Sequence, residues 1–401
     1  MAHTVSDLPE VARPAPTSRL ERRRIVFVLN YAVLGGAERQ SLLLASHLAE
    51  REGAEVAVCA LTDAEGTAAT LFRERGIPWH TSPLRWTDSR GSRVQALLRL
   101  AARLRRLRPD VLMPYCAVPD VACGLVWPLT GASLCVWNQQ DVNPSTRVSR
   151  STLRRAVRKT PRFVGNSRHA AEFVIALGAP RQHVQVIHTA VELAEPESNR
   201  ATWRNRLGFR EDDFVVCSLA HLHRFKDHDT LLRAWRIASH ELAGEDRGAV
   251  LLLAGRPAGA EDHTKALAFD LGLGSSVRFL GEVHDVSGLL GAADLGVLSS
   301  RAEGCPNAVL ESMAAGLAVA GTDIPGLREP LGDDGSGLLA PPGDAEGLAA
   351  AFVKAARDSD LRRVLGERNR RRAREEFSPE RAVEARVALF REGLAQASRR
   401  R

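Results

Sequence analysis

Two glutamates, Glu303 and Glu311, are separated by seven residues in a segment that joins an apolar, strand-like run to a predicted helix. In an open α/β sheet, ligands bind beyond the carboxyl ends of strands, and the amides at a helix N-terminus attract phosphate oxygens. Asn307 and Glu311 are spaced i, i+4 and share one helix face, so Glu311 can reach a ribose diol. Glu303 precedes the helix, so the two carboxylates address two ends of one ligand. The backbone that follows Glu303 is a candidate grip for a diphosphate: Gly304, Cys305, Pro306, Asn307, Ala308 and Val309.

A simpler interpretation exists for this pair of acids. Glu303 would be a solvated loop residue, and Glu311 would be a first-turn carboxylate that the helix dipole stabilises. Acids favour first helical turns in general, so an isolated pair at this spacing would favour the simpler interpretation. The residues around Glu303 and Glu311 must therefore distinguish a ligand-binding pair from two ordinary surface acids.

The elements that would position these residues alternate between strand and helix. Short apolar runs predict buried parallel strands, with helices between them. In the first half the strands are expected at 25–29, 56–61, 77–80, 111–113, 134–137, 162–165 and 186–187. After a polar stretch, further strands are expected at 214–219, 249–254, 277–280, 295–298 and 318–320. This pattern predicts two doubly wound, Rossmann-like domains.

Composition agrees with a two-domain globular protein. The chain has 401 residues, of which 44% are hydrophobic and 26% charged, and a formal net charge of +7. The six cysteines form no C-x-x-C pair, and we interpret them as free thiols. No stretch approaches the ~20 apolar residues of a membrane helix, and the N-terminus lacks a signal-peptide core. We therefore expect a cytoplasmic location.

The surroundings of Glu303 and Glu311 resemble the glutamate motif of retaining GT-B glycosyltransferases. This large bacterial family includes sucrose-phosphate synthases and phosphatidylinositol mannosyltransferases, and the resemblance extends from about Arg24 to Ala350. Further matches follow in the order of the family: 34–40, 165–167, 186–187, 226–228, 279–281, 321–326 and 337–342. The agreement at many ordered sites favours the functional interpretation of the two acids.

The resemblance implies two Rossmann-like domains that face each other across a cleft, with a C-terminal helix that crosses back to the N-terminal domain. On this basis we expect a disordered arm at 1–21, an acceptor-binding domain at 22–192, a linker at 193–212, a nucleotide-sugar-binding domain at 213–375 and a returning helix at 376–401. The implied reaction moves a hexosyl unit from a nucleoside-diphosphate sugar to an acceptor hydroxyl, with retention of anomeric configuration. A UDP-sugar is favoured, a GDP-sugar is next, and no cofactor is expected.

The resemblance also implies roles for single residues. Gly35 and Gly36 would let the backbone approach the donor diphosphate or sugar. Lys226 would stabilise the charge of the leaving group, and Glu303 would bind sugar hydroxyls, so these two are the predicted catalytic residues. Glu311 would bind the ribose.

The chain departs from the family at two places. His221 stands five positions before Lys226, where relatives usually carry Arg or another polar residue, and Arg224 is a candidate to compensate. Relatives often place a His on a loop after the fourth or fifth strand, where this chain has Asn138 and Gln139. Either side chain can hydrogen-bond the sugar or acceptor, but neither is a general base. For Asn138, a structural turn is an equal alternative.

A metal site is a further hypothesis for the segment around Lys226. The acidic and imidazole side chains there resemble a metal cluster: His221, His223, Asp227, His228 and Asp229. A metal needs converging ligands, which proximity in sequence does not supply, and Asp229 more simply caps the next helix. We therefore expect no metal, as is general for GT-B enzymes.

Basic residues gather in two predicted helices of the N-terminal half, around Arg99–Arg108 and Arg147–Lys159. A solvated face is the first interpretation, and contact with an anionic membrane or a lipid-diphosphate acceptor is the second. Nucleic acid is not expected, because no stacking aromatics are interleaved with the charges. The expected acceptor is a saccharide or lipid-linked saccharide of envelope, exopolysaccharide or glycolipid assembly, with a soluble natural product as the alternative.

Three other classes share part of this pattern. A Rossmann dehydrogenase would need G-x-G-x-x-G after the first strand, where this chain has Leu34–Glu38. A GT-B sugar-nucleotide epimerase shares the architecture, but the glutamate motif favours transfer. A non-catalytic sugar-binding relative would bind nucleotide without turnover.

Overall fold

The computed structural model describes residues 20–140 and 148–399. The expected arm at 1–21 therefore lies almost wholly outside the described residues, as does Arg147 of the expected basic helix. The chain divides into two compact units. The first contains the residues up to Thr189 together with those from Pro379 onward, and the second is Ala190–Ser378.

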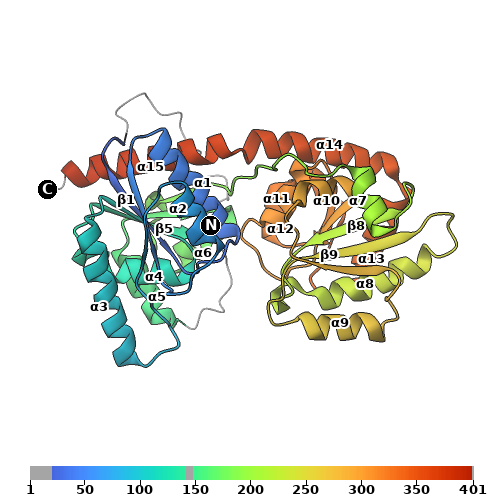
Figure 1. The fold of residues 1–401 in the computed structure, drawn as a ribbon, viewed down its shortest axis with the longest axis horizontal. Helices are drawn as coiled ribbons and strands as arrows, with labels where there is room; N and C mark the ends of the chain where they lie inside the picture. The colour runs from blue at the N-terminus through green and yellow to red at the C-terminus, as the bar shows by residue number, and fades with distance from the viewer. Residues whose placement is uncertain (1–19, 141–147, 400–401) are drawn as a thin grey trace, which may run out of the picture. The chain divides into compact units, whose positions relative to one another are not determined.

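The first unit is built on a seven-stranded parallel sheet in the order β3-β2-β1-β4-β5-β6-β7 (Figure 1). Its strands are β1 (Arg24–Leu29), β2 (Glu55–Ala60), β3 (Trp79–Thr81), β4 (Val111–Pro114), β5 (Leu134–Gln139), β6 (Arg162–Gly165) and β7 (Val184–Val186). The central strand β1 pairs with both β2 and β4 and is buried from Ile25 onward. Burial on both faces explains why these strands are continuous apolar runs.

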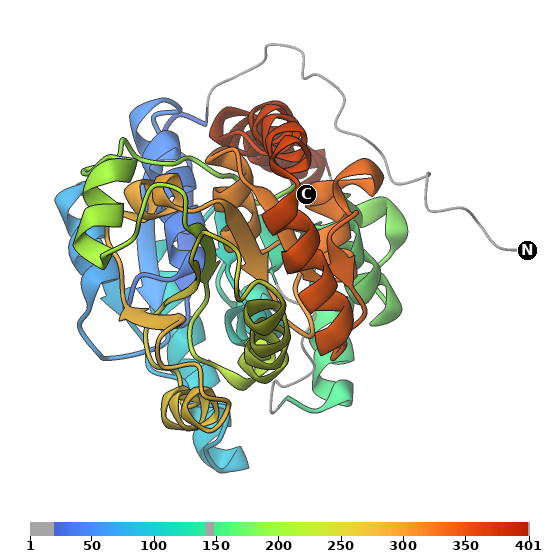
Figure 2. The same ribbon diagram turned by 90° about the vertical axis from the view of Figure 1, so that its right-hand side faces the viewer.

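Helices cover both faces of this sheet (Figures 1 and 2). They are α1 (Gly36–Glu50), α2 (Thr67–Glu74), α3 (Arg90–Leu107), α4 (Ala117–Val126), α5 (Arg150–Lys159), α6 (Arg168–Ala176) and α15 (Pro379–Arg399), with short 3-10 turns η2 (Trp127–Leu129) and η3 (Arg181–His183). Phe27 of β1 packs in one cluster with α1, α2 and α15. Val28 packs on the opposite side with α3 and α4, and α5 and α6 continue that layer. The described unit is thus a doubly wound α/β domain.

The second unit repeats the plan with a six-stranded parallel sheet in the order β10-β9-β8-β11-β12-β13. Its strands are β8 (Phe214–Leu219), β9 (Ala249–Ala254), β10 (Val277–Gly281), β11 (Leu295–Leu298), β12 (Ala318–Thr322) and β13 (Leu339–Ala340). Its helices are α7 (Arg200–Leu207), α8 (His228–Glu241), α9 (Glu261–Asp270), α10 (Val286–Ala292), α11 (Asn307–Ala314), α12 (Pro325–Leu331), α13 (Ala345–Arg357) and α14 (Ser359–Glu376), with 3-10 turns η4 (Arg224–Lys226) and η5 (Asp333–Gly335). Two Rossmann-like units confirm the expected fold class.

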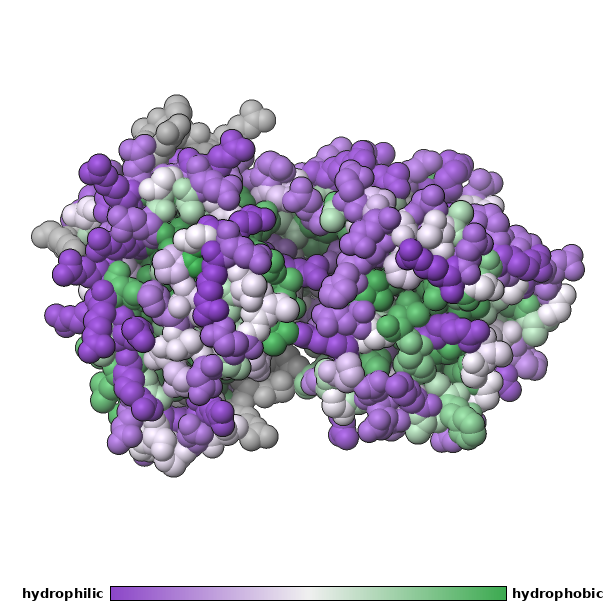
Figure 3. Space-filling model, in the orientation of Figure 1, coloured by the Kyte–Doolittle hydropathy of each residue, from purple (hydrophilic) through white to green (hydrophobic). Residues whose placement is uncertain are grey.

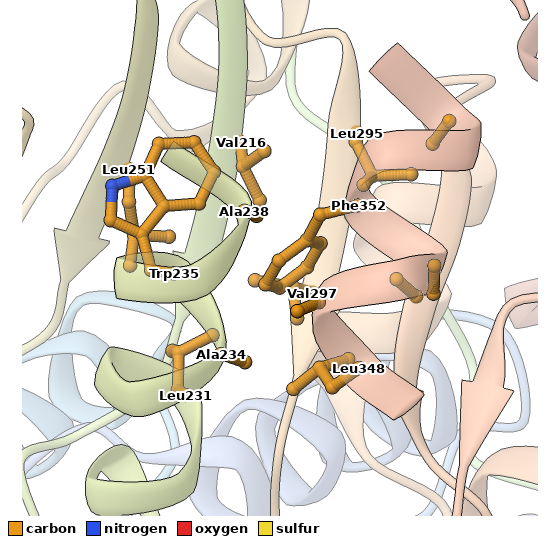
Figure 4. Close-up of a cluster of buried hydrophobic side chains, with 14 of the residues drawn as sticks. Val216, Leu231, Ala234, Trp235, Ala238, Leu251, Leu295, Val297, Leu348 and Phe352 are labelled. Carbon is orange, nitrogen blue, oxygen red and sulfur yellow. The ribbon is translucent and has the colours of Figure 1, made fainter. Parts of the chain in front are cut away.

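The core of the second unit lies where α8 and α13 meet the sheet (Figure 4). Trp235 of α8 and Phe352 of α13 are fully buried, and their ring centroids lie 5.8 Å apart in an edge-to-face arrangement. Val216 and Leu295 reach the same cluster from neighbouring strands. This packing fixes β8 and β11 side by side, and the loops after these strands carry the predicted site.

Two predicted boundaries differ from the structure. The segment 193–212, predicted to be a linker, contains α7, whose Arg204 is buried and donates to the carbonyl of Ala292 and the carboxylate of Asp294. This segment is therefore a folded part of the second unit. The returning helix, predicted at 376–401, is α15 and begins at Pro379, after α14 ends at Glu376, because proline suits the first turn of a helix but not its interior. The helix α15 belongs to the first unit.

Candidate functional site

The loops after β8 and β11 form the predicted site in the second unit. These strands are parallel neighbours, so both loops leave from the same edge of the sheet. The Arg301 amide donates to the Phe225 carbonyl over 2.9 Å, and the Ser299 hydroxyl donates to the Lys226 carbonyl over 2.7 Å. These bonds hold η4, which carries Lys226, against the segment that leads to Glu303.

Lys226 and Glu303 form an ion pair at this edge. The Nζ atom of Lys226 lies 2.5 Å from Oε1 of Glu303, and the two side chains keep 25% and 17% of their surface exposed. The ammonium is therefore held in place but still reachable by a ligand. A positive charge at this position can stabilise a developing phosphate charge, and a carboxylate can accept hydroxyl hydrogen bonds.

Asp227 holds the loop after β8 in place through hydrogen bonds of its side chain. Its buried carboxylate accepts two hydrogen bonds from the Arg301 guanidinium and one from the Thr230 hydroxyl. Hydrogen bonding to Asp227 raises the pKa of Arg301 further above its ordinary value. Asp227 has a left-handed backbone, with φ of 49°, and so turns the chain from η4 into α8. The sequence named Asp227 only as a possible metal ligand, and this anchor could not be predicted because its Arg partner lies 74 residues away.

The side chains of the suspected metal cluster have other partners. Asp227 binds Arg301, and Asp229 lies 2.9 Å from Nε2 of His263. His228 is buried, and burial together with the charge of Lys226 lowers its pKa to about 4. Within the described ranges 20–140 and 148–399, no group of three or more potential ligand side chains converges to hold a metal ion.

His221 and Arg224 are both exposed at this edge. His221 follows β8 directly, and Arg224 opens η4. The ring of His223 stacks on Phe225 with centroids 5.2 Å apart, an aromatic pair that was not predicted from the sequence. In the described part of the chain, the Arg224 side chain forms no hydrogen bond or ion pair with Lys226 or Glu303, so compensation for the His221 departure stays a prediction.

The backbone after Glu303 leads into α11. Gly304, Cys305 and Pro306 are buried, and Cys305 packs in a cluster with Val309 of the helix. Asn307 and Ala308 are partly exposed, and no side chain among the described residues caps this helix N-terminus. Their amides are therefore the accessible part of the predicted diphosphate grip, whereas the residues before them support it by packing.

Glu311 is partly exposed on α11. Burial, with a smaller contribution from the Glu311 charge, raises the pKa of the Cys217 thiol to about 12. Glu311 of α11 therefore lies close enough to Cys217 of β8 for its charge to act on that thiol. Lys226 and Glu303 are thus in contact at the ends of β8 and β11, and Glu311 lies on α11, the helix that follows the β11 loop.

In the first unit, Gly35 and Gly36 begin α1. The Gly35 amide donates to the carboxylate of the buried Glu38 over 3.2 Å, which closes the first turn. A Cβ at Gly35 would lie 2.8 Å from that carboxylate, so a capping contact accounts for this glycine. Gly36 is exposed in the first turn and stays available for the predicted ligand contact.

Asn138 and Gln139 do not lie on a loop, which corrects the prediction. Both are buried in β5, and pairing with β6 continues through Gln139 opposite Gly165. The Gln139 side chain accepts a hydrogen bond from the Trp137 indole over 2.9 Å. The side-chain amide of Asn138 has no hydrogen-bond partner among the residues that the structure describes. Burial keeps both side chains from solvent.

A cavity of about 520 Å³ opens at the carboxyl ends of the first unit's strands. Asn30 follows β1, Asp63 follows β2, and Trp86 and Cys116 follow β3 and β4. Polar and aromatic groups of this kind suit a hydroxyl-rich ligand. This cavity was not predicted from the sequence, although polar residues directly after strand ends are a usable signal.

Comparison with known proteins agrees with the fold. The family model described as "Glycosyltransferase Family 4" matches residues 34–195, and that of "Glycosyl transferases group 1" matches residues 199–372. The solved structure of HepE from Anabaena in complex with UDP and glucose covers 94% of this chain and 100% of that one, with a TM-score of 0.77 and 22% identity. Sucrose-phosphate synthase from Thermosynechococcus elongatus covers 94% and 100%, with a TM-score of 0.74 and 19% identity.

Sequence relatives cover different shares of the chain. The putative glycosyltransferase EpsD of Bacillus subtilis is 32% identical over 53% of this chain and 55% of its own length. The D-inositol 3-phosphate glycosyltransferase of Saccharomonospora viridis is 30% identical over 63% and 60%. The lipopolysaccharide core biosynthesis glycosyltransferase LpsE of Rhizobium meliloti is 30% identical over 89% of this chain and 96% of its own length. Since this last match spans both units, the chain belongs to the glycosyltransferases of the GT-B fold.

Proposed function

We propose that this glycosyltransferase moves a hexosyl unit from a nucleoside-diphosphate sugar to an acceptor hydroxyl with retention of anomeric configuration. A UDP-sugar is the favoured donor and a GDP-sugar the next. The observation that carries the proposal is the accessible Lys226–Glu303 ion pair, beside the uncapped start of α11 in the described structure. Retention is supported by the resemblance of the Glu303–Glu311 segment to retaining enzymes.

Each group has a separate task in the proposed reaction. The Lys226 ammonium exchanges Glu303 for the diphosphate and stabilises the charge that grows as the sugar leaves. The freed carboxylate of Glu303 accepts hydrogen bonds from sugar hydroxyls, and Glu311 binds the ribose diol. The amides of Asn307 and Ala308 contact phosphate oxygens at the helix N-terminus. None of these tasks requires a metal ion, so we expect activity to survive a chelator.

The first unit would bind the acceptor, and its cavity supports a hydroxyl-rich one. A saccharide or lipid-linked saccharide of envelope or exopolysaccharide assembly is the first candidate, supported by the name of the Rhizobium relative. A small soluble polyol is the second candidate, supported by the inositol phosphate transferase relative and by the modest cavity volume. Replacing Asp63 with Asn should raise the KM for the acceptor and leave the KM for the donor unchanged in either case.

Thermal unfolding with UDP, GDP, ADP and their sugar conjugates tests the donor site. A nucleotide at about a hundred times its Kd stabilises the native state by about 2.7 kcal/mol. One nucleotide should therefore raise the unfolding midpoint of the wild type, and Glu311→Ala should lose that shift. Glu346→Ala, which removes an exposed first-turn carboxylate of α13, is the matched control and should keep it.

The outcomes separate the competing functions. A shift together with transfer to an acceptor supports the proposal. A shift together with donor isomerisation in the absence of acceptor identifies an epimerase. No shift with any of these nucleotides contradicts the proposed donor site.

A further inference from the structure

The outer face of α3 carries an apolar stripe that the core does not use. The helix buries Ala96, Leu100 and Leu104 against the sheet. On its other side Val94 and Leu98, spaced i, i+4, are 50% and 57% exposed. A helix on the surface of a globular domain normally turns a polar face to solvent. The second apolar stripe of α3 is therefore available to a partner.

The helices α3 and α5 both carry positive charge. Neither α3 nor α5 contains Asp or Glu. Arg99, Arg105 and Arg106 are exposed on α3. The exposed cations of α5 are Arg150, Arg154, Arg155, Arg158 and Lys159. With no carboxylate on either helix to neutralise them, these cations favour an anionic partner.

The two helices belong to one layer of the first unit. Both lie on the face of the sheet that α4 also covers, and α4 is almost wholly buried between them. The turn η2 joins this layer, because the Trp127 indole donates to the Lys159 carbonyl and Leu129 is 54% exposed. Figures 1 and 2 both show one end of α3 projecting from the unit. In Figure 3, hydrophobic and hydrophilic spheres mix along the edge that α3 forms.

We propose that α3, η2 and α5 form a docking surface for an anionic lipid bilayer, which we call the α3–α5 surface. Val94, Leu98 and Leu129 enter the boundary between headgroups and acyl chains. The arginines extend their stems along this apolar surface and place their guanidinium groups at lipid phosphates. Exposed aliphatic side chains between cations fit a bilayer better than a nucleic acid, which needs stacking aromatics. The inference is independent of the transfer reaction.

Sedimentation with vesicles tests this surface. The purified full chain is mixed with vesicles of phosphatidylcholine alone or of phosphatidylcholine with phosphatidylglycerol, at low and high salt. We expect binding that requires phosphatidylglycerol and weakens with salt. The triple variant Arg99→Gln/Arg105→Gln/Arg106→Gln should bind about a hundredfold more weakly, since each cation near such a surface contributes roughly fivefold.

The apolar stripe needs its own variant and control. Val94→Gln/Leu98→Gln should weaken binding about tenfold, because two aliphatic side chains no longer enter the bilayer. Phe269→Gln removes an 82% exposed apolar side chain from α9 of the second unit and should change nothing. Arg371→Gln/Arg374→Gln removes exposed charges of α14 and should likewise leave binding unchanged. All replaced side chains are exposed, so unfolding midpoints should stay at the wild-type value.

Three results would overturn the inference. The first is unchanged vesicle binding in both α3 variants. The second is an equal loss of binding in the α9 or α14 controls. The third is tighter binding to an RNA or DNA oligonucleotide that depends on the arginines but not on Val94 and Leu98, which would identify a nucleic-acid surface.

Discussion

The Arg301 guanidinium donates two hydrogen bonds to the buried Asp227 carboxylate, from Nε over 3.0 Å and from Nη2 over 3.2 Å. Asp227 directly follows Lys226 and Arg301 lies two residues before Glu303, so this pair holds together the two loops that carry the predicted catalytic residues. The position of the Lys226 ammonium relative to the Glu303 carboxylate therefore depends on the Asp227–Arg301 pair, although neither of these two residues is predicted to touch the donor.

Replacing Asp227 with Asn tests this dependence. Asn tolerates the left-handed backbone at this position and keeps the size of the side chain, but it loses the charge. Because Arg301 is largely exposed, we expect the unfolding free energy to fall by about 1–2 kcal/mol. The KM for the donor should rise as Lys226 loses its fixed position. Urea unfolding and steady-state kinetics measure both effects, and a variant with wild-type values in both would contradict the role of the pair.

Replacing Lys226 with Ala should lower kcat by about 100- to 1000-fold, the usual cost of removing one group that stabilises transition-state charge. Lys265→Ala, which removes an exposed lysine on α9, is the matched control and should keep full activity. The measurement is kcat with the donor that the unfolding screen identifies. A Lys226→Ala enzyme with raised KM but unchanged kcat would show that the ammonium only binds the ground state.

Buried His228 should make stability depend on pH. Its pKa is lowered from 6.5 to about 4, so the unfolded chain takes up a proton that the folded chain resists. The contribution of His228 is present above pH 6.5 and is lost as pH falls towards 4, by about 3 kcal/mol in all. Unfolding free energy of wild type and His228→Gln across this range measures it. Equal pH slopes for the two proteins would contradict the prediction. The charged neighbours that act on the imidazole, Lys226, Asp229 and Asp227, are present in both proteins, so their own titration does not distinguish them.

Much of the fold was predictable because each strand is a short apolar run between polar turns. The helix α7 was missed because its residues are mostly polar and its one buried residue is Arg204, which donates to the distant Ala292 carbonyl and Asp294 carboxylate. A helix was expected between the strands that became β4 and β5, but the bounds of α4 could not be given, because it is buried nearly all round and so shows no amphipathic period. Long-range packing decides both cases.

The predicted site also has a part that the sequence reveals and a part that depends on long-range contacts. Lys226, Glu303 and Glu311 were identifiable from the sequence because they lie in segments that follow predicted strands, and because the two glutamates have a recognisable spacing. The bond between Asp227 and Arg301 was not, because it joins two loops that only the pairing of β8 with β11 brings together. Asn138 was placed on a loop because the sequence does not show that β5 pairs with β6 beyond Trp137.

Replacing Gly326 with Ala should disturb Glu303 through its backbone and its Cβ, while the Glu303 carboxylate itself is unchanged. A Cβ at Gly326 would lie 2.5 Å from the Glu303 carbonyl oxygen, so the backbone must shift. We expect a loss of about 1–3 kcal/mol in unfolding free energy and weaker donor binding. At Gly337 an added Cβ would meet no described atom within 4 Å, so Gly337→Ala should stay within about 0.5 kcal/mol of wild type. Equal effects of the two variants would show that the close approach is unimportant.

Asn138 gives the sharpest test of a structural against a ligand-binding role. Its buried amide has no hydrogen-bond partner in the described part of the chain, and an unsatisfied buried polar group costs about 1–3 kcal/mol. Asn138→Leu, similar in size but apolar, should therefore raise the unfolding free energy by about 1 kcal/mol. Acceptor kinetics should stay at wild-type values, since the side chain is fully buried. A stable Asn138→Leu protein with a raised acceptor KM would instead establish that the amide contacts the acceptor and that β5 opens when it binds.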